Sequence, residues 1–386
     1  MRISDDRSIS VFFSFFLVIA VIQSCRNSPN ETRKSSAGNE VLSAERLSIE
    51  RFDGYTRVTV FNPWQGQQNI AMEYYLVRSG AAIPEGIDSA NVIFVPVHKM
   101  VCMSVTHSAM IEALGCGDCI IGQSGINLVW SPSLKLKIQE RKIPEVGYDS
   151  GINTELIMKL SPDVLIMYGI GNESAGYVNK LKDAGVKLVY DADYLENTPL
   201  GKAEWIRLFG ALLCRDEAAD SIYTSEAELY NHKAEIIRNE TGTRPEVLLG
   251  FPYKGTWYIS PGNSYISRLI SDAGGSYLWE DTRSERSMPY GIENVFTRAI
   301  KADFWLNPGI AESKRDIAAV DSRLADLPCY AGDNIYNNIK RLNSSGGNDY
   351  WENGAVHPSM LLQDISEILH PGLSPDSSLV FYKKLK

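Results

Sequence analysis

The sequence has no basic block, and this absence argues against a nucleic-acid partner. Lysine and arginine total 38 against 47 aspartate and glutamate residues, which leaves a formal net charge of −9. The basic residues are scattered, and no basic run is longer than a pair such as Arg141-Lys142 or Lys383-Lys384. A nucleic-acid groove depends on clustered positive charge. We therefore expect no nucleic-acid binding.

Enzyme signatures and metal-ligand clusters are missing as well. The sequence contains no GxSxG turn, Walker A loop, HExxH helix or glycine-rich dinucleotide fingerprint. Its five histidines are dispersed, and His357 and His370 are each followed by proline. A zinc or manganese site needs histidines and carboxylates that converge. We predict no resident metal, no cofactor and no catalysis.

Apart from the N-terminus, the sequence has no apolar run long enough to suggest a membrane span. Residues 10–22 are strongly apolar, but they are shorter than the roughly 20 residues that a span requires and fit a signal-peptide core. The run ends in Ile22-Gln23-Ser24-Cys25, which resembles a bacterial lipobox. This pattern predicts a signal peptide over residues 1–24 and a lipid on Cys25. A plain signal peptide and an uncleaved anchor are the alternatives.

The remaining five cysteines are an odd number, which a fully paired disulfide framework does not accommodate. Cys116 and Cys119 have CxxC spacing, but they follow a predicted helix end and precede a strand. A redox motif usually lies at a helix N-terminus. We interpret this CxxC as a structural turn, and a small disulfide there stays open.

The sequence then alternates between strand and helix patterns. Residues 25–45 are polar and predict a flexible lipidated tether. Residues 55–61 and 72–77 suggest an antiparallel start. The apolar runs 91–97, 119–122, 164–167 and 186–190 alternate with helical patterns over 106–114, 154–160 and 175–184. This β-α-β-α-β order predicts a parallel sheet in an N-terminal lobe, residues 46–201.

The stretch 202–239 has a different pattern. It predicts a short helix, a break at Cys214-Arg215-Asp216, and one long helix without glycine or proline. Asp216 is a candidate cap. The long helix would extend roughly 36 Å at about 1.5 Å per residue. It is either a rigid bridge to a second α/β lobe, residues 240–386, or an ordinary core helix of one larger domain.

The two predicted lobes contain a weak sequence echo. Glu155 precedes a helix, then Asp163 and an apolar strand. Glu293 precedes a helix, then Asp303 and an apolar strand. Chance recurrence of a common βα unit is the alternative explanation.

The order and spacing of several segments resemble the Fe/B12-type periplasmic substrate-binding proteins of ABC importers. The segments include Ile143-Pro-Glu-Val-Gly147, Ser161-Pro-Asp163-Val-Leu-Ile and Leu269-Ile-Ser-Asp-Ala-Gly-Gly275. The resemblance covers about residues 91–371. It implies an α/β fold with two parallel-sheet lobes joined by a single long bridging helix, the class III arrangement. It also implies a monomeric lipoprotein of the cell envelope, anchored by its lipid and facing the periplasm.

The resemblance gives two glutamates a role. In this family one glutamate on each lobe docks onto arginines of the membrane permease, and the motifs place these at Glu155 and Glu293. Separated carboxylates on one face would set orientation more than raw affinity. The alternative is an acid in the first helical turn, stabilised by the helix dipole.

In such folds the ligand lies in a cleft lined by loops at strand ends. Flat aromatic side chains there suit a ferric siderophore, haem or cobalamin, and cations would meet an anionic chelate. The predicted cleft residues are Lys99, Trp130, Tyr168, Tyr253, Trp257, Arg341, Tyr350 and Trp351. For each of them, plain packing or surface exposure is the alternative.

The resulting prediction is a binding lipoprotein that delivers an iron chelate, haem or cobalamin to an ABC permease and its ATPase. An enzyme on the same two-lobe fold and a scaffold lipoprotein without a transport role are the alternatives.

Overall fold

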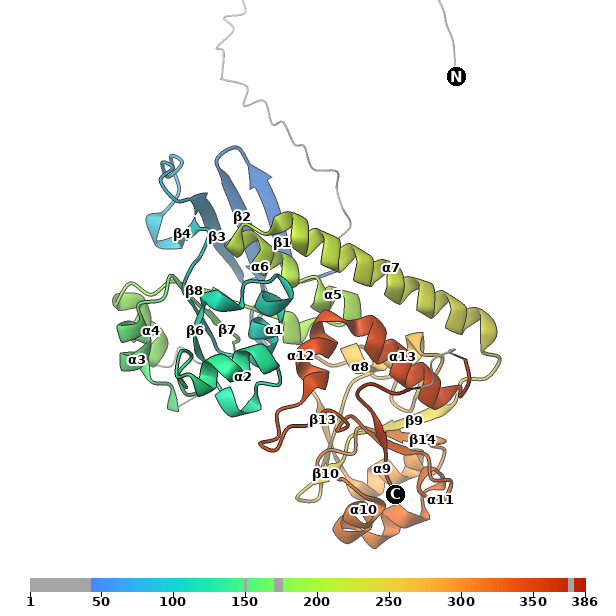
Figure 1. The fold of residues 1–386 in the computed structure, drawn as a ribbon. Coiled ribbons are helices and arrows are strands. Elements are labelled where there is room, and N and C mark those ends of the chain that lie inside the picture. Colours follow the sequence, from blue (N-terminus) through green and yellow to red (C-terminus); the bar gives the residue numbers. More distant parts are fainter. Residues whose placement is uncertain (1–42, 149–150, 170–175, 374–377) are drawn as a thin grey trace, which may run out of the picture. The chain divides into compact units, whose positions relative to one another are not determined.

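The computed structural model describes residues 43–148, 151–169, 176–373 and 378–386, and these residues build two α/β lobes (Figure 1). The predicted fold class is confirmed, because each lobe contains a parallel sheet covered by helices. Cys25 lies outside the described residues. No helix in the described part combines the length and the apolar character that crossing a bilayer requires.

A four-stranded sheet precedes the parallel sheet of the N-terminal lobe. Its strands are β1 (Leu47–Phe52), β2 (Tyr55–Phe61), β3 (Ala71–Arg78) and β4 (Val92–Val95), in this spatial order. The first three strands are antiparallel, and β4 runs parallel to β3. Val58, Val60 and Leu76 point into the core of the lobe. This is the alternation expected of a sheet with one buried face.

The prediction that residues 91–97 form a doubly buried strand of the parallel sheet is wrong. Within the described residues β4 pairs with β3 alone, and the Phe94 side chain is 48% exposed. The first strand of the parallel sheet is instead β5 (Met100–Cys102). A short apolar run fits an edge strand as well as a central one, so the pattern does not distinguish the two.

The parallel sheet of the N-terminal lobe has four strands. In spatial order they are β6 (Ile120–Gln123), β5, β7 (Val164–Met167) and β8 (Leu188–Tyr190). The helices of this part are α1 (Val105–Ala113), α2 (Pro132–Gln139), α3 (Thr154–Leu160) and α4 (Gly176–Asp183). Ser104 and Asn153 cap α1 and α3 by accepting backbone N–H bonds. Helix α2 was not predicted, since its apolar positions are few.

Three consecutive helices follow the first parallel sheet: α5 (Pro199–Ala203), α6 (Ile206–Leu213) and α7 (Asp216–Glu240). Every residue of α6 is buried. Gly210 allows α6 to lie against α7, because a Cβ at this position would come within 2.5 Å of the Ala219 Cβ. The prediction that Asp216 caps α7 is wrong. Asp216 lies in the first turn, where its charge favours the helix dipole, and pairs with Arg51 at 2.9 Å.

Helix α7 connects the two lobes and contributes to both cores. Ala219 and Tyr223 belong to the N-terminal core, whereas Tyr230, Ala234 and Ile237 belong to the C-terminal core. The helix packs against α6 at one end and against α13 (Pro358–Leu369) at the other (Figure 1). The sequence pattern changes along α7 because each half of the helix packs against a different core.

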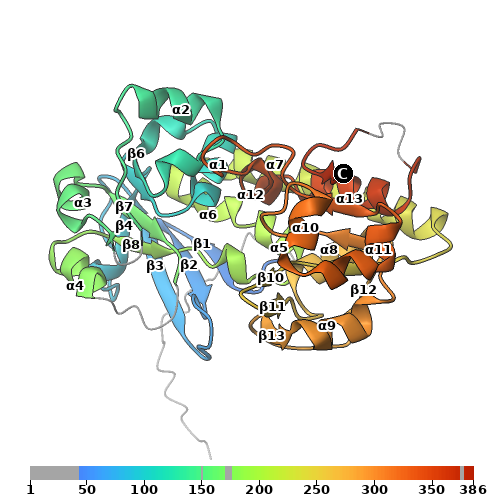
Figure 2. The same cartoon turned by 90° about the horizontal axis from the view of Figure 1, so that it is seen from below.

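The C-terminal lobe contains a mixed five-stranded sheet and a small antiparallel one. The first, in spatial order, has β12 (Ser276–Tyr277), β9 (Glu246–Leu249), β14 (Phe304–Leu306), β15 (Ile335–Asn337) and β16 (Lys383–Lys384), of which β16 is antiparallel. The second has β10 (Pro252–Tyr253), β11 (Thr256–Ile259) and β13 (Met288–Gly291). The further helices are α8 (Tyr265–Asp272), α9 (Ile292–Ala299), α10 (Lys314–Val320), α11 (Pro328–Ala331) and α12 (Asp349–Val356). Figure 2 shows these elements from below.

Helices α10, α11 and α12 were missed by the sequence prediction. A Gly-rich loop over residues 343–347 precedes α12. The structure ends this loop at Asn348, whose side chain caps α12 by accepting the Tyr350 backbone N–H. Tyr350 and Trp351 are therefore on a helix, which fixes their side chains more firmly than a loop would.

Candidate functional site

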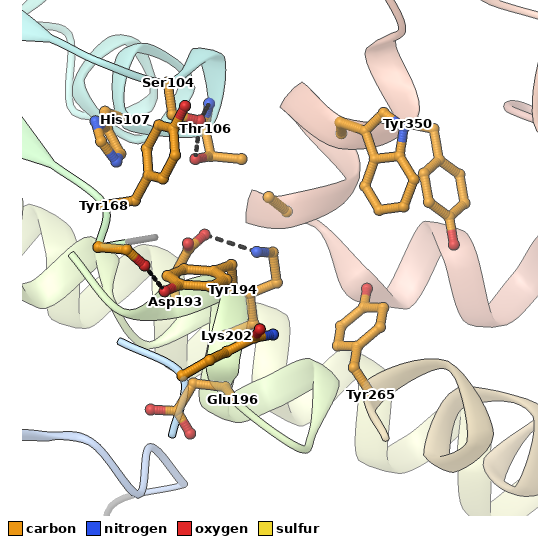
Figure 3. Close-up of a pocket in the computed structure, with 14 residues that line it drawn as sticks. Ser104, Thr106, His107, Tyr168, Asp193, Tyr194, Glu196, Lys202, Tyr265 and Tyr350 are labelled. Carbon is orange, nitrogen blue, oxygen red and sulfur yellow. Dashed lines mark hydrogen bonds and ion pairs between the residues drawn. The ribbon is translucent and has the colours of Figure 1, made fainter. Parts of the chain in front are cut away.

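A cavity of about 490 Å³ lies at the carboxyl ends of the parallel strands of the N-terminal lobe. Ser104 follows β5, Tyr168 follows β7 and Asp193 follows β8. The carboxyl ends of parallel strands meet at one edge of a sheet, which is where α/β proteins commonly bind ligands. Figure 3 shows these side chains facing residues of the C-terminal lobe.

Both lobes line this first cavity, but with different side chains. The N-terminal part, including α5, contributes Gln65, Ser104, Thr106, His107, Tyr168, Gly169, Asp193, Tyr194, Glu196 and Lys202. The C-terminal lobe contributes an aromatic wall of Tyr265 from α8 and Tyr350 and Trp351 from α12, next to Ala355. A ligand in this cavity would contact both lobes at once.

A second cavity, of about 640 Å³, lies at the carboxyl ends of the C-terminal parallel strands. Leu249 ends β9, Asn307 follows β14 and Asn338 follows β15. Tyr265, Tyr350 and Trp351 line this cavity too. The three aromatic residues therefore border both cavities.

The most polar part of the first cavity is an ion pair between Asp193 and Lys202. The Lys202 Nζ lies 2.7 Å from Asp193 Oδ2, and both side chains are largely buried. The Asp193 backbone N–H donates to Asp191 Oδ1 at 2.8 Å, which fixes the turn after β8. The lysine charge is thus already compensated by protein, in a place with little water to screen it.

His107 and Asp191 form a buried pair behind this ion pair. The His107 Nε2 lies 3.7 Å from Asp191 Oδ2. Burial, together with the nearby Lys202 charge, lowers the pKa of His107 to about 4, so the imidazole is neutral at pH 7. Burial and the neighbouring Asp193 charge raise the pKa of Asp191 well above its usual range. Neither group brings a positive charge to the cavity at neutral pH.

Glu196 forms part of the cavity wall and also anchors the start of the folded chain. Its carboxylate accepts the backbone N–H of Glu45 at 2.9 Å, the backbone N–H of Arg46 at 3.0 Å and the Trp205 indole N–H at 3.0 Å. Burial raises the pKa of Glu196, and these three donors oppose that shift. The side chain is therefore held by the protein itself.

Three of the predicted cleft residues line the first cavity: Tyr168, Tyr350 and Trp351. Tyr350 is nearly completely buried, whereas Trp351 is 52% exposed. Trp351 thus lines both cavities and keeps about half of its surface exposed. This placement gives it the larger area for contact with a ligand.

Lys99 lies at the opposite end of the sheet from the cavity. It precedes β5, and its backbone N–H donates to Asp163 Oδ2 at 2.9 Å, just before β7 begins. His98 is in the same turn and makes a matching bond at 2.8 Å. The sequence prediction assigned the parallel strand to residues 91–97, and this error placed the following loop at the wrong end of the sheet.

Trp257 and Tyr253 do not line either cavity. The Trp257 indole has no exposed surface; it stacks on Trp305, with ring centroids 5.6 Å apart, and donates to the Leu249 carbonyl at 2.9 Å. Tyr253 is 64% exposed at the tip of the β10–β11 hairpin, with the Lys254 Nζ 5.1 Å from its ring centroid. Trp257 is thus a core residue and Tyr253 a surface residue in this structure.

Trp130 and Arg341 belong to a direct contact between the lobes rather than to a cavity wall. The Arg341 guanidinium lies 5.5 Å from the Trp130 ring centroid and 2.9 Å from Asp349. The backbone N–H groups of Trp130 and Ser131 donate to the Glu352 carboxylate of α12. Burial raises the pKa of Glu352 to about 7.

Sequence reasoning missed His107, Asp193, Tyr194, Lys202 and Tyr265. For Asp193 and Tyr194 a signal existed, because they directly follow the apolar run that forms β8. His107 and Tyr265 were assigned only to helical patterns, which do not indicate what a helix faces. Lys202 is in the stretch predicted to be part of the bridging helix.

Glu155 and Glu293 occupy equivalent places in the two lobes. Each is exposed and lies in the first turn of its helix, α3 and α9 respectively. Glu293 is 3.3 Å from Arg323, in an exposed ion pair. Both the docking role and the helix-dipole role predicted from the sequence are compatible with these positions.

The CxxC segment forms a turn. Cys119 ends a short 3₁₀ turn before β6, and Cys116 and Cys119 are both free thiols. Burial raises the pKa of Cys119 to about 12, which makes its thiol unreactive. Among the residues described, no group of three histidine, cysteine or acidic side chains could hold a metal ion.

The sequence profile of the periplasmic binding protein family matches residues 100–337, more than half of the chain. The chain belongs to this family. Family members bind small-molecule ligands and work with ABC transporters, and they are binding proteins rather than enzymes. The four-stranded sheet of residues 47–95 precedes the part matched by the periplasmic binding protein profile.

Two relatives of this periplasmic binding protein come from Methanocaldococcus jannaschii. One is an uncharacterised lipoprotein, 29% identical over 298 residues that cover 74% of this chain and 68% of the relative. Another uncharacterised lipoprotein is 25% identical over 332 residues, which cover 82% of this chain and 81% of the relative. Both relatives are lipoproteins, as the sequence predicts for this chain.

Solved structures of other periplasmic binding proteins share the fold. A periplasmic haem-binding protein of Pseudomonas aeruginosa matches with a TM-score of 0.56 and 17% identity, over 75% of this chain and 98% of that chain. A periplasmic solute-binding protein of Veillonella parvula matches with a TM-score of 0.53 and 17% identity, over 74% and 84%. At these identities the likeness concerns the fold alone.

Proposed function

We propose that this protein is the lipid-anchored substrate-binding component of an ABC importer. It would capture a metal chelate or metal-containing ring compound (a ferric siderophore, haem or cobalamin) between its lobes and deliver it to the permease. The observation that carries the proposal is the first cavity, which has a polar wall from the N-terminal lobe and an aromatic wall from the C-terminal lobe. Family membership and the lipoprotein relatives support it.

The aromatic wall suits a large ligand with flat faces. Tyr265, Tyr350 and Trp351 border both cavities, so a ligand stacked on them could reach into either one. Aromatic side chains provide a large contact area at low entropic cost, and tyrosine hydroxyls add directional hydrogen bonds. Each cavity volume falls in the range of about 300–1,000 Å³ that is usual for small-molecule sites.

Ligand binding is tested by titrating the full-length, detergent-solubilised protein with ferric siderophores, haemin and cyanocobalamin while recording tryptophan fluorescence, with inner-filter correction. We expect saturable quenching by one ligand class and a loss of roughly 10-fold or more in affinity for Trp351→Ala. Tyr258→Ala is the matched control, because Tyr258 is as exposed as Trp351 but lines neither cavity. Absence of saturation with every ligand would favour the scaffold alternative, and chemical change of the ligand would favour an enzyme.

Delivery to the permease would use Glu155 and Glu293. Both carboxylates are exposed and begin equivalent helices, so they can meet two basic sites on one partner surface. We expect Glu155→Lys and Glu293→Lys to reduce uptake in cells while ligand affinity in solution stays unchanged. Glu217→Lys is the control, because Glu217 is an exposed acid in the first turn of α7. Normal uptake by the double variant would contradict the docking role.

The lipid anchor would be Cys25. We expect cells that express the protein to incorporate radiolabelled fatty acid into it and the variant Cys25→Ala to lose the label. Retention of the label in that variant would place the lipid elsewhere.

A further inference from the structure

The cavities contain little positive charge. Among the described residues that line the two cavities, Lys202 is the one lysine or arginine, and its Nζ is 2.7 Å from Asp193. Glu196 lines the first cavity and Glu312 the second. The lining therefore has more carboxylates than cations, and its cation is already paired.

Arg341 and Lys340 are engaged by other groups of the protein and line neither cavity. Arg341 pairs with Asp349 at 2.9 Å, and the Lys340 Nζ donates to the Leu379 carbonyl. Arg286 is exposed and is not among the residues that line either cavity.

The cavity lining also contains neutral polar groups that can form hydrogen bonds. Hydroxyl groups come from Ser104, Thr106 and Tyr265, and an amide comes from Gln65. Such groups form hydrogen bonds with carbonyl and amide groups of a ligand without needing charge. An anionic ligand would instead lose its hydration next to the Asp193–Lys202 pair and Glu196 and find no free counter-charge, which is costly in a partly buried site.

We propose that the bound ligand has no net negative charge and is a neutral or cationic metal complex with outer amide or hydroxamate groups. This inference rests on the proposed function and narrows it. Neutral ferric trihydroxamates and corrinoids fit the lining. Ferric tris-catecholates, ferric citrate and haem with its two propionates do not, because each brings uncompensated negative charge to the carboxylates of the N-terminal wall.

The test compares ligands that differ mainly in charge. The full-length, detergent-solubilised protein is titrated with a neutral ferric trihydroxamate, cyanocobalamin, a trianionic ferric tris-catecholate and haemin under the same salt conditions. We expect a neutral complex to bind roughly 100-fold more tightly than either anionic one, since like charges in contact are strongly unfavourable. An anionic complex that binds as tightly as the neutral ones would overturn the inference and leave the importer proposal standing. Absence of binding by all four would overturn both.

Two variants test the cause of the preference. Gln65→Lys adds a cation to the lining at an exposed position, and Asp193→Asn releases the charge of Lys202. Each should improve binding of the anionic complexes by about 10-fold relative to the neutral ones. Arg286→Ala is the matched control and should leave the ratio unchanged. An unchanged ratio in Gln65→Lys, which carries little risk to folding, would contradict the electrostatic explanation, as would a loss of anion binding in Arg286→Ala.

Discussion

At the start of their parallel sheets the two lobes have the same aspartate–backbone contact, but the carboxyl ends of the sheets border cavity walls of different chemistry. Asp163 precedes β7, and its Oδ2 accepts the backbone N–H groups of His98 and Lys99 before the neighbouring strand β5. Asp303 precedes β14, and its Oδ2 accepts the backbone N–H of Glu246 at the start of the neighbouring strand β9. The sequence echo between the halves therefore has a structural counterpart in these strand contacts.

The carboxyl ends of the same sheets differ in chemistry. After β8 the N-terminal lobe places Asp191, Asp193 and Glu196, which accept hydrogen bonds, and Asp193 also pairs with Lys202. The C-terminal lobe presents Tyr350 and Trp351 on a capped helix. One lobe therefore sets the charge of the cavity, whereas the other provides most of its aromatic contact area.

The lobes also fasten opposite ends of the described chain with buried carboxylates. Glu204 accepts the backbone N–H groups of Ser43 and Ala44, at 2.7 and 2.8 Å. Asp364 accepts those of Val380, Phe381 and Tyr382, at 2.7, 2.6 and 3.1 Å.

The largest expected effect is a difference in stability between alanine variants of two tryptophans in the C-terminal lobe. Trp257→Ala removes a fully buried ring stacked on Trp305 and should lower the free energy of unfolding by about 3–5 kcal/mol. Trp351→Ala removes a half-exposed ring and should cost about 1 kcal/mol or less while weakening ligand binding. Urea denaturation and ligand titration measure the two effects. Equal losses of stability would refute the distinction between core and cavity wall.

Asp364→Ala should lower the free energy of unfolding by about 3 kcal/mol, because three backbone N–H groups lose a charged acceptor at once. Hydrogen exchange should show faster exchange of the Val380, Phe381 and Tyr382 amides. Glu204→Ala is the corresponding change in the N-terminal lobe and should instead expose the amides of Ser43 and Ala44. Protection unchanged at both sites would show that neither carboxylate fastens a chain end.

Glu352→Gln tests the contact between the lobes through its pH dependence. The folded pKa of Glu352 is raised by burial from 4.5 to about 7, so between these pH values the folded protein holds a proton that the unfolded chain has released. This group therefore costs stability progressively as pH rises from 4.5 to 7. The variant should gain up to about 3 kcal/mol relative to the wild type over that range, then stay level. Thermal or urea unfolding at several pH values measures the difference; a constant difference would contradict the shift.

The smallest expected loss of stability concerns the two aspartates that precede β7 and β14. Asp163→Ala and Asp303→Ala should each cost about 1–2 kcal/mol, because both carboxylates are exposed and accept bonds from backbone N–H groups. The double variant should lose the sum, since the two sites are in different lobes. Urea denaturation checks this. A strong effect in one lobe and none in the other would break the parallel between them.

Much of the fold could be predicted because its signals are local. Val164–Met167 is a continuous apolar run that is fully buried in β7, and the long helix α7 has neither glycine nor proline. Glu155 and Glu293 could be placed at helix starts for the same reason. In contrast, residues 91–97 have the pattern of a central strand, yet β4 lies at an edge, because pairing partners are not encoded in a short apolar run.

The candidate site was predictable only in part. Tyr168 and Trp351 were predicted to be cleft residues, and they line the first cavity. In contrast, Trp257 is buried in the core, and Lys99 lies at the other end of its sheet. Tyr265 is on a helix whose inward face no sequence pattern distinguishes from any other apolar face. Side-chain direction depends on packing between elements that are distant in the chain.

By itself the sequence determined the alternation of strands and helices, the connecting helix and the family resemblance, because these depend on periodicity and spacing along the chain. The tertiary structure alone decided which end of each sheet borders a cavity and that Lys202 is compensated by Asp193. It also decided that Trp351 faces the space between the lobes while Trp257 is enclosed. These properties arise from contacts between segments far apart in the sequence, and the charge available to a ligand is what remains after such contacts have formed.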